Sequence, residues 1–161
     1  MSAKAYEPGG FFVDPHLAVG FNSAQGTHYH AGVDLGYGLS EQMAVGAGAY
    51  YSAGEHPSHG REIGGGPFWS YLQPITSFLV GSLKQEILYV DMFNPIETQT
   101  VSGSTYSHTR ETGIASASTA GFHFHFMPFG FSVGYRLMIG LTNDKLDNGR
   151  SGFFAGFSIG I

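Results

Sequence analysis

The 161-residue chain has no cysteine, little charge and no long apolar run, and each absence excludes a class of protein. Without cysteine there is neither a disulfide framework nor a thiolate metal site. Charged residues make up only 12% of the chain, about half the usual share for a soluble domain. No stretch approaches the roughly 18 consecutive apolar residues that indicate a transmembrane helix. A net charge of -5 without a basic patch also argues against a nucleic-acid partner.

Glycine and aromatic residues are what the chain has in abundance, with 25 glycines and 15% aromatics. The length fits a single domain over residues 1–161, in which residues 1–10 form a short N-terminal extension. That extension lacks the apolar core of a signal peptide. We therefore expect a mature chain, with Met1 in place of a removed signal peptide.

Hydrophobicity along the chain alternates with a period of two almost everywhere, which predicts an all-β protein. The predicted strands cover residues 11–21, 27–39, 43–53, 62–73, 78–93, 111–126, 129–142 and 151–161. Their lengths are close to the roughly 9–11 residues that a tilted membrane-spanning strand needs.

The connections between these strands alternate between short and long. Short turns are predicted at 39–42, 73–77 and 127–130, and longer polar loops at 22–26, 54–61, 94–110 and 143–150. Short turns at one end and long loops at the other are typical of a transmembrane up-and-down β-barrel. Both termini would then lie at the short-turn end, which faces the periplasm in such barrels.

Each strand has one bulky apolar face and one face of small or polar residues. In the second strand Tyr29, Val33 and Leu35 lie on one side, and His28, His30 and Asp34 lie on the other. If the bulky face pointed inward, the small face would meet water with scarcely any lysine or glutamate on it. If the bulky face points outward into lipid, the small residues fit the narrow interior of an eight-stranded barrel. We therefore predict that the bulky face contacts lipid.

Aromatic residues also gather where a membrane barrel would place them, near the two membrane–water interfaces. The predicted aromatic girdle consists of Tyr37, Tyr51, Trp69, Tyr71, Tyr89 and Phe131.

Three segments carry a resemblance to a known family: "AGVDLGYGLSEQMAVGAGAYY" (31–51), "IGGGPFWSYLQPITSFLVGSL" (63–83) and "GFFAGFSIGI" (152–161). In strand and turn layout and in glycine placement, the chain resembles small outer-membrane β-barrel proteins of the OmpA/OmpX type. The resemblance implies an eight-stranded antiparallel up-and-down transmembrane β-barrel in a bacterial outer membrane. The outward apolar face predicts contact with membrane lipid, and the mixed polarity of the loops fits contact with lipopolysaccharide, a surface ligand or a protein partner.

Polar residues on the inward face of a thin barrel must pair with one another, because bulk water does not reach them. The predicted interior network consists of Asp14, His16, His28, His30, Asp34, Lys84, Glu86, His123, His125 and Arg136. The favoured interpretation is a paired ionic plug that fixes the barrel shape. The two His-x-His pairs could also chelate a metal. They are expected toward opposite ends of the barrel, so no metal site and no cofactor are predicted.

The long loops are the part of the protein in which we expect its function to lie. We predict a structural, adhesive or interaction role through loops 54–61 and 94–110, in a barrel that is neither a pore nor an enzyme. One alternative is a lipid-modifying outer-membrane enzyme that resembles the known lipid A deacylase. The only match to its His-x-Ser pair is His56-Pro57-Ser58, which has no third orienting group at a suitable spacing. The other alternative is a soluble β-barrel that binds a hydrophobic ligand, which requires the opposite orientation of the two faces.

Overall fold

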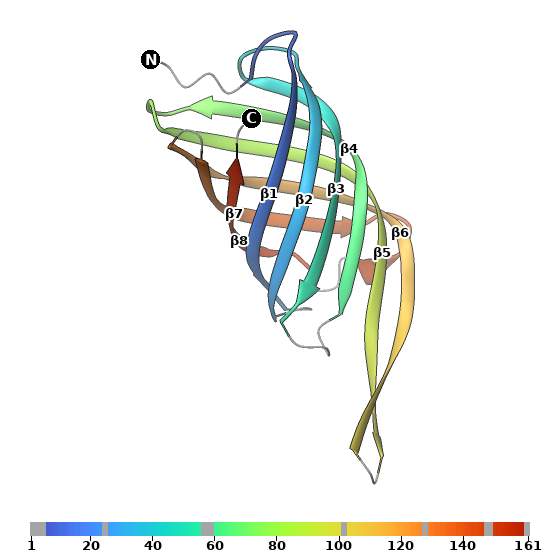
Figure 1. Ribbon diagram of the computed structural model, residues 1–161. Helices are drawn as coiled ribbons and strands as arrows, with labels where there is room; N and C mark the ends of the chain where they lie inside the picture. Colours follow the sequence, from blue (N-terminus) through green and yellow to red (C-terminus); the bar gives the residue numbers. More distant parts are fainter. Residues whose placement is uncertain are drawn as a thin grey trace.

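The structure is a computed structural model, which describes residues 6–23, 26–55, 60–100, 103–126, 129–146 and 150–159. Eight antiparallel strands follow one another around a closed barrel, and the last strand pairs with the first (Figure 1). The strands are β1 (Phe11–Asn22), β2 (Gly26–Gly38), β3 (Met43–Gly54), β4 (Arg61–Pro74), β5 (Leu79–Thr100), β6 (Gly103–Phe126), β7 (Phe129–Gly140) and β8 (Gly152–Ile159). This confirms the eight-stranded antiparallel up-and-down β-barrel that the alternation predicted.

The barrel has two ends with different connections. At the turn end, short connections join β2 to β3, β4 to β5 and β6 to β7, and β1 begins there (Figure 1). At the opposite loop end, the 3-10 helix η2 (Asp144–Leu146) lies between β7 and β8. No helix among the described residues is long and apolar enough to cross a membrane.

The longest connection was predicted wrongly. Residues 94–110 were expected to form a loop, but β5 and β6 continue as a paired ribbon from Asn94↔Thr109 to Thr100↔Gly103. β4 pairs with β5 only as far as Phe93, so the ribbon projects beyond the barrel wall (Figure 1). The polarity of this segment suggested a loop. A two-stranded ribbon can be polar on both faces, however, and this one is rich in threonine, which favours strands.

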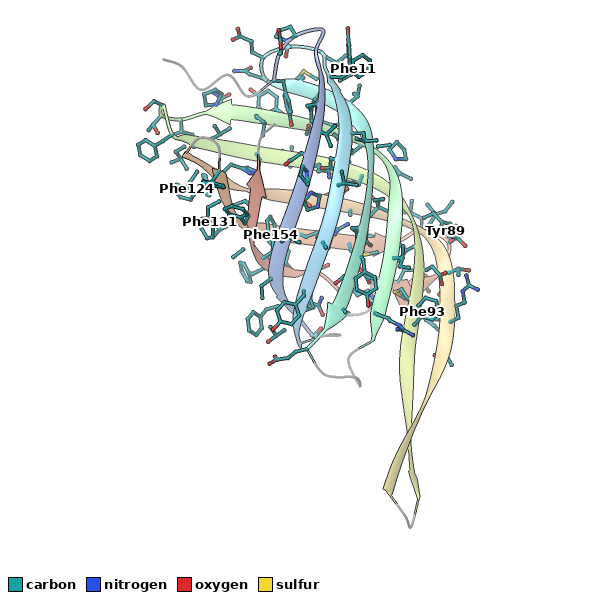
Figure 2. All side chains as sticks on the ribbon, in the orientation of Figure 1. Phe11, Tyr89, Phe93, Phe124, Phe131 and Phe154 are labelled. Atoms are coloured by element: carbon teal, nitrogen blue, oxygen red, sulfur yellow. The ribbon has the colours of Figure 1, made fainter. Side chains whose placement is uncertain are left out.

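The outer surface of the barrel is apolar and bulky. Every strand contributes large apolar side chains that are exposed, including Leu17 at 61%, Leu35 at 56% and Phe153 at 70%. Phe11, Tyr89 and Phe131 project away from the wall in Figure 2. The soluble alternative required the opposite orientation, with this bulky face lining an apolar cavity. That orientation is wrong.

Glycine on the inner face leaves room for large neighbours on the next strand. Gly32 is the register partner of His16, and Gly48 is the register partner of Asp34. A Cβ at either glycine would overlap the facing side chain. Large and small inward residues therefore interlock across the strands, which fills the narrow interior.

The end of the N-terminal extension covers the turn end of the barrel. The backbone of Gly9 and Gly10 hydrogen-bonds with Gly38, at the start of the β2–β3 turn. Tyr6 stacks on Phe12 with ring centroids 5.0 Å apart, and its hydroxyl lies 2.8 Å from Ser70 Oγ, inside the barrel. Burial raises the pKa of Tyr6 to about 12, so the phenol stays neutral at physiological pH.

Candidate functional site

Oppositely charged side chains form a continuous row of ion pairs across the barrel interior. Lys84 Nζ lies 2.6 Å from Asp34 Oδ2 and 3.0 Å from Glu86 Oε1. Arg136 Nη2 lies 3.3 Å from Glu86 Oε2. This row of ion pairs thus runs from β2 through β5 to β7. Because a charge buried without a partner costs several kcal/mol, this pairing keeps the ionised groups stable inside the barrel.

Aromatic rings and a guanidinium group continue the cluster around the interior. The imidazoles of His16 and His30 stack with centroids 5.4 Å apart, and His30 stacks on Tyr50 at 4.8 Å. The guanidinium carbon of Arg136 lies 4.7 Å from the centre of the Tyr50 ring. The aromatic rings from β1, β2 and β3 thus reach the row of ion pairs at Arg136 on β7.

Asp14, His16 and Asp34 lie close together on β1 and β2. Each offers one potential metal-ligating atom, and these three atoms lie within 4.8 Å of one another. Asp14 and Asp34 are direct register partners, which explains why their carboxyl groups meet.

Three predicted interior residues lie elsewhere. His28 Nδ1 lies 3.4 Å from Asn22 Nδ2, toward the loop end of β2. His123 is half-buried on β6, opposite Val80 and Ser132. The side chain of His125 lies outside the described residues. The cluster is therefore built from seven of the ten predicted residues: Asp14, His16, His30, Asp34, Lys84, Glu86 and Arg136.

A second interior ion pair was missed by the sequence analysis. Arg150 Nη1 lies 2.6 Å from Glu62 Oε2, and only 5% and 7% of the two side chains are exposed. Glu62 shares the inward face of its strand with Gly64, so alternation could have identified it. Arg150 belongs to a segment predicted as a polar loop, and no pattern indicated that it turns into the barrel.

A cluster of buried, largely apolar side chains lies beside this second pair in the loop-end half of the interior. Its members come from four strands and η2: Tyr50, Leu88, Val90, Met92, Ala115, Ala117, Met138 and Leu146. Leu146 lies in η2, so this short helix between β7 and β8 packs into the loop end of the barrel.

On the outer surface, the predicted girdle residues all point away from the interior. Tyr37, Trp69, Tyr71 and Phe131 lie toward the turn end, and Tyr51 and Tyr89 lie toward the loop end. Tyr71 is half-buried and the other five are exposed. Two bands of this kind are what a membrane interface would require.

Two arginines flank an aromatic ring at the loop end of the outer surface. Arg61, Phe93 and Arg110 are register partners on β4, β5 and β6. The guanidinium carbons of Arg61 and Arg110 lie 5.4 Å and 5.7 Å from the centre of the Phe93 ring. Arg110 also pairs with Asp91 at 2.6 Å. This row, Arg61–Phe93–Arg110, is the basic row of the outer surface.

The enzymatic alternative depended on His56 and Ser58, which lie outside the described residues. No catalytic arrangement of nucleophile, base and orienting group is found among the described side chains that were predicted as sites.

Comparisons with known proteins agree on the fold. No protein-family model and no curated protein sequence matches the chain. The N-terminal β-barrel domain of OprF from Pseudomonas aeruginosa superposes with a TM-score of 0.59 at 15% identity, over 92% of this chain and 94% of that one. Neisserial surface protein A gives a TM-score of 0.66 at 16% identity, over 94% and 97%. A designed transmembrane β-barrel gives 0.55 at 14% identity, over 98% and 99%. The chain therefore has the fold of the small outer-membrane β-barrels that its sequence resembles.

Proposed function

We propose that the protein is an integral barrel of a bacterial outer membrane, which holds a closed interior and acts outside the cell through its loop end. The observation that carries this proposal is the inversion of polarity: large apolar side chains are exposed around the whole barrel, and ion pairs line its interior. Monomeric soluble proteins rarely expose apolar patches larger than a few hundred Å². A lipid bilayer is the solvent in which this surface is stable.

Three features favour an interior that does not conduct ions. The row of ion pairs from Asp34 to Arg136 crosses the interior. The apolar cluster lies in the loop-end half, and Tyr6 lies over the turn end. In planar bilayers we expect no stable channel current from the refolded protein. Steady unitary currents would contradict this part of the proposal and identify a pore.

The β5–β6 ribbon is the part of the molecule best placed to meet a partner, because it extends beyond the last pairing with β4 and β7. At its base, the basic row offers guanidinium groups at the outer edge of the proposed membrane region. Guanidinium groups bind phosphate in a bidentate manner, which suits the phosphate groups of lipopolysaccharide. We therefore propose a structural or adhesive role, with lipopolysaccharide as the surrounding lipid and a surface partner for the ribbon.

A shortened variant tests the role of the ribbon. Residues 96–107 are replaced by Asn-Gly, which closes a two-residue hairpin in register. The barrel pairs up to Asn94↔Thr109 remain, so we expect the variant to refold with the same heat-dependent electrophoretic shift as the parent. Adhesion of cells that display the protein should fall to background. Unchanged adhesion would assign the role to another loop.

Membrane insertion itself is tested by an arginine at two depths on the outer surface. Val33→Arg, placed near the middle of β2, should destabilise the protein by about 2–4 kcal/mol in lipid vesicles, because arginine is costly near the bilayer centre. Leu141→Arg, placed just beyond β7 at the loop end, should lower the free energy of unfolding by only about 0–1 kcal/mol. The measurement is urea unfolding followed by tryptophan fluorescence of Trp69. Equal and small costs at both depths would show that the outer surface does not face lipid.

A further inference from the structure

Asp14, His16 and Asp34 converge at one point of the interior, near the turn end. Their potential ligand atoms lie within 4.8 Å of one another. Ligands bound to a first-row metal at about 2 Å are separated by roughly 3–4 Å, so small side-chain movements would complete such a shell. The two strands hold the three residues in fixed register, Asp14 opposite Asp34 and His16 opposite Gly32.

The imidazole of His16 is already oriented. Its Nδ1 lies 3.3 Å from the carbonyl oxygen of Asp14, and its ring stacks on His30. When Nδ1 donates to that carbonyl, Nε2 becomes the basic nitrogen and the available ligand. A backbone carbonyl on one ring nitrogen is the usual way in which a metal-binding histidine is held. Gly32 lies under this ring and leaves the space that Nε2 needs.

Asp34 is held in a similar way. Its Oδ2 accepts a hydrogen bond from Lys84 at 2.6 Å, and its Oδ1 lies over Gly48. Lys84 therefore holds one oxygen of the carboxylate, and Gly48 leaves room for the other. Lys84 also pairs with a second carboxylate, because Glu86 Oε1 lies 3.0 Å from the same ammonium group.

Two acidic groups face each other at this point of the interior. Asp14 and Asp34 are register partners, and their ligand atoms lie within 4.8 Å of each other and of His16. A cation between the two carboxylates would offset their mutual repulsion, which is strong where the dielectric constant is low.

We propose that Asp14, His16 and Asp34 form a binding site for a divalent transition-metal ion of the zinc type. The ligands are one carboxylate oxygen from each aspartate and Nε2 of His16, and water completes the shell. An imidazole ligand selects zinc, nickel, copper or iron over magnesium and calcium, which prefer oxygen alone. The site requires only the barrel fold and is independent of the proposed role of the ribbon.

The experiment uses the full chain, refolded in detergent, stripped with a chelator and titrated with Zn²⁺ by calorimetry. One equivalent should bind. His16→Gln and Asp14→Asn should each weaken the binding about tenfold or more, because each removes one of three protein ligands. His28→Gln is the matched control, since it removes an interior histidine outside the site and should leave the affinity unchanged. The heat-dependent electrophoretic shift checks that each variant has refolded.

X-ray absorption at the zinc edge keeps the proposal testable if a variant fails to refold, since it uses the parent protein alone. The proposed site predicts one imidazole nitrogen and otherwise oxygen neighbours around zinc. Two or more imidazoles would assign the ion to other histidines and overturn the proposal. The absence of stoichiometric binding, or equal affinity in His16→Gln and the parent, would overturn it as well.

Discussion

The two halves of the barrel interior are filled by different kinds of side chain. In the turn-end half, charged groups and rings from β1, β2, β3, β5 and β7 share partners in one network. In the loop-end half, largely apolar side chains pack together beside one ion pair, Glu62–Arg150, which is about as deeply buried as Glu86 of the network. The ion pairs and stacked rings of the first half all come from strands. The second half depends on a connection, because Leu146 and Arg150 come from the β7–β8 segment.

This difference has a consequence for stability. In the network, Lys84 contacts two acids and Glu86 contacts two cations, so the loss of one group leaves its partners with others. Glu62 and Arg150 form a single ion pair, and Tyr50 lies beside Glu62 as well as beside Arg136. A buried ion pair contributes little net stability, but removing one member leaves an uncompensated charge. The loop-end half should therefore be the more sensitive to a single charge deletion.

The largest effect is expected for Arg150→Met. It leaves the Glu62 carboxylate buried without its guanidinium partner, which should reduce the free energy of unfolding by about 3–5 kcal/mol. The double variant Glu62→Leu, Arg150→Met removes both charges and should recover most of this loss. Urea unfolding in lipid vesicles measures both, and Arg61→Met, at an exposed arginine, is the control. If the single and double variants were equally unstable, Arg150 would act through packing and not through its charge.

The next effect is expected for Leu88→Ala in the apolar cluster. Leu88 is fully buried, so its truncation leaves a cavity and should cost about 2–5 kcal/mol. Leu83→Ala, on the outer face of the same strand, is the comparison, because Leu83 is exposed and leaves no cavity. The same unfolding assay measures the two variants. Similar costs at both positions would contradict a tightly packed loop-end half.

A smaller effect is expected at the turn end for Tyr6→Phe. The substitution removes the hydroxyl that bonds to Ser70 but keeps the ring that stacks on Phe12, so it should cost about 0.5–1.5 kcal/mol. Hydrogen exchange at the Gly9 and Gly38 amides, followed by NMR in micelles, measures whether the extension opens more often. Unchanged exchange would show that the extension is held by its backbone bonds alone.

The smallest effect concerns Glu111 at the loop end. Hydrogen bonds from Lys145 and Asn143 hold the pKa of this carboxyl below its ordinary value. These bonds therefore stabilise η2 above the ordinary pKa of glutamate, and their contribution is lost as the pH falls through the lower folded value. Lys145→Met should move the titration of Glu111 to higher pH, measured by carbon NMR of its carboxyl group. An unmoved titration would show that Lys145 does not influence Glu111 in solution.

Much of the turn-end half could be predicted from alternation. Asp34, Lys84, Glu86 and Arg136 each occupy inward positions of clear strands, and a barrel interior forces such charges to pair. Their partners could not be predicted, because the pairs cross the interior between non-adjacent strands. Separation along the sequence gives no information about which strands face each other across a closed barrel.

The sequence alone determined that this chain has eight strands, each with one bulky face and one face of small or polar residues, because a period of two directly encodes which residues share a face. The tertiary structure alone decided three further features. Asp14, His16 and Asp34 meet at one point, Arg150 turns into the barrel, and the 94–110 segment is a ribbon. The physical reason is that strand tilt and register set the height of each residue around the barrel, and these depend on how all eight strands close together.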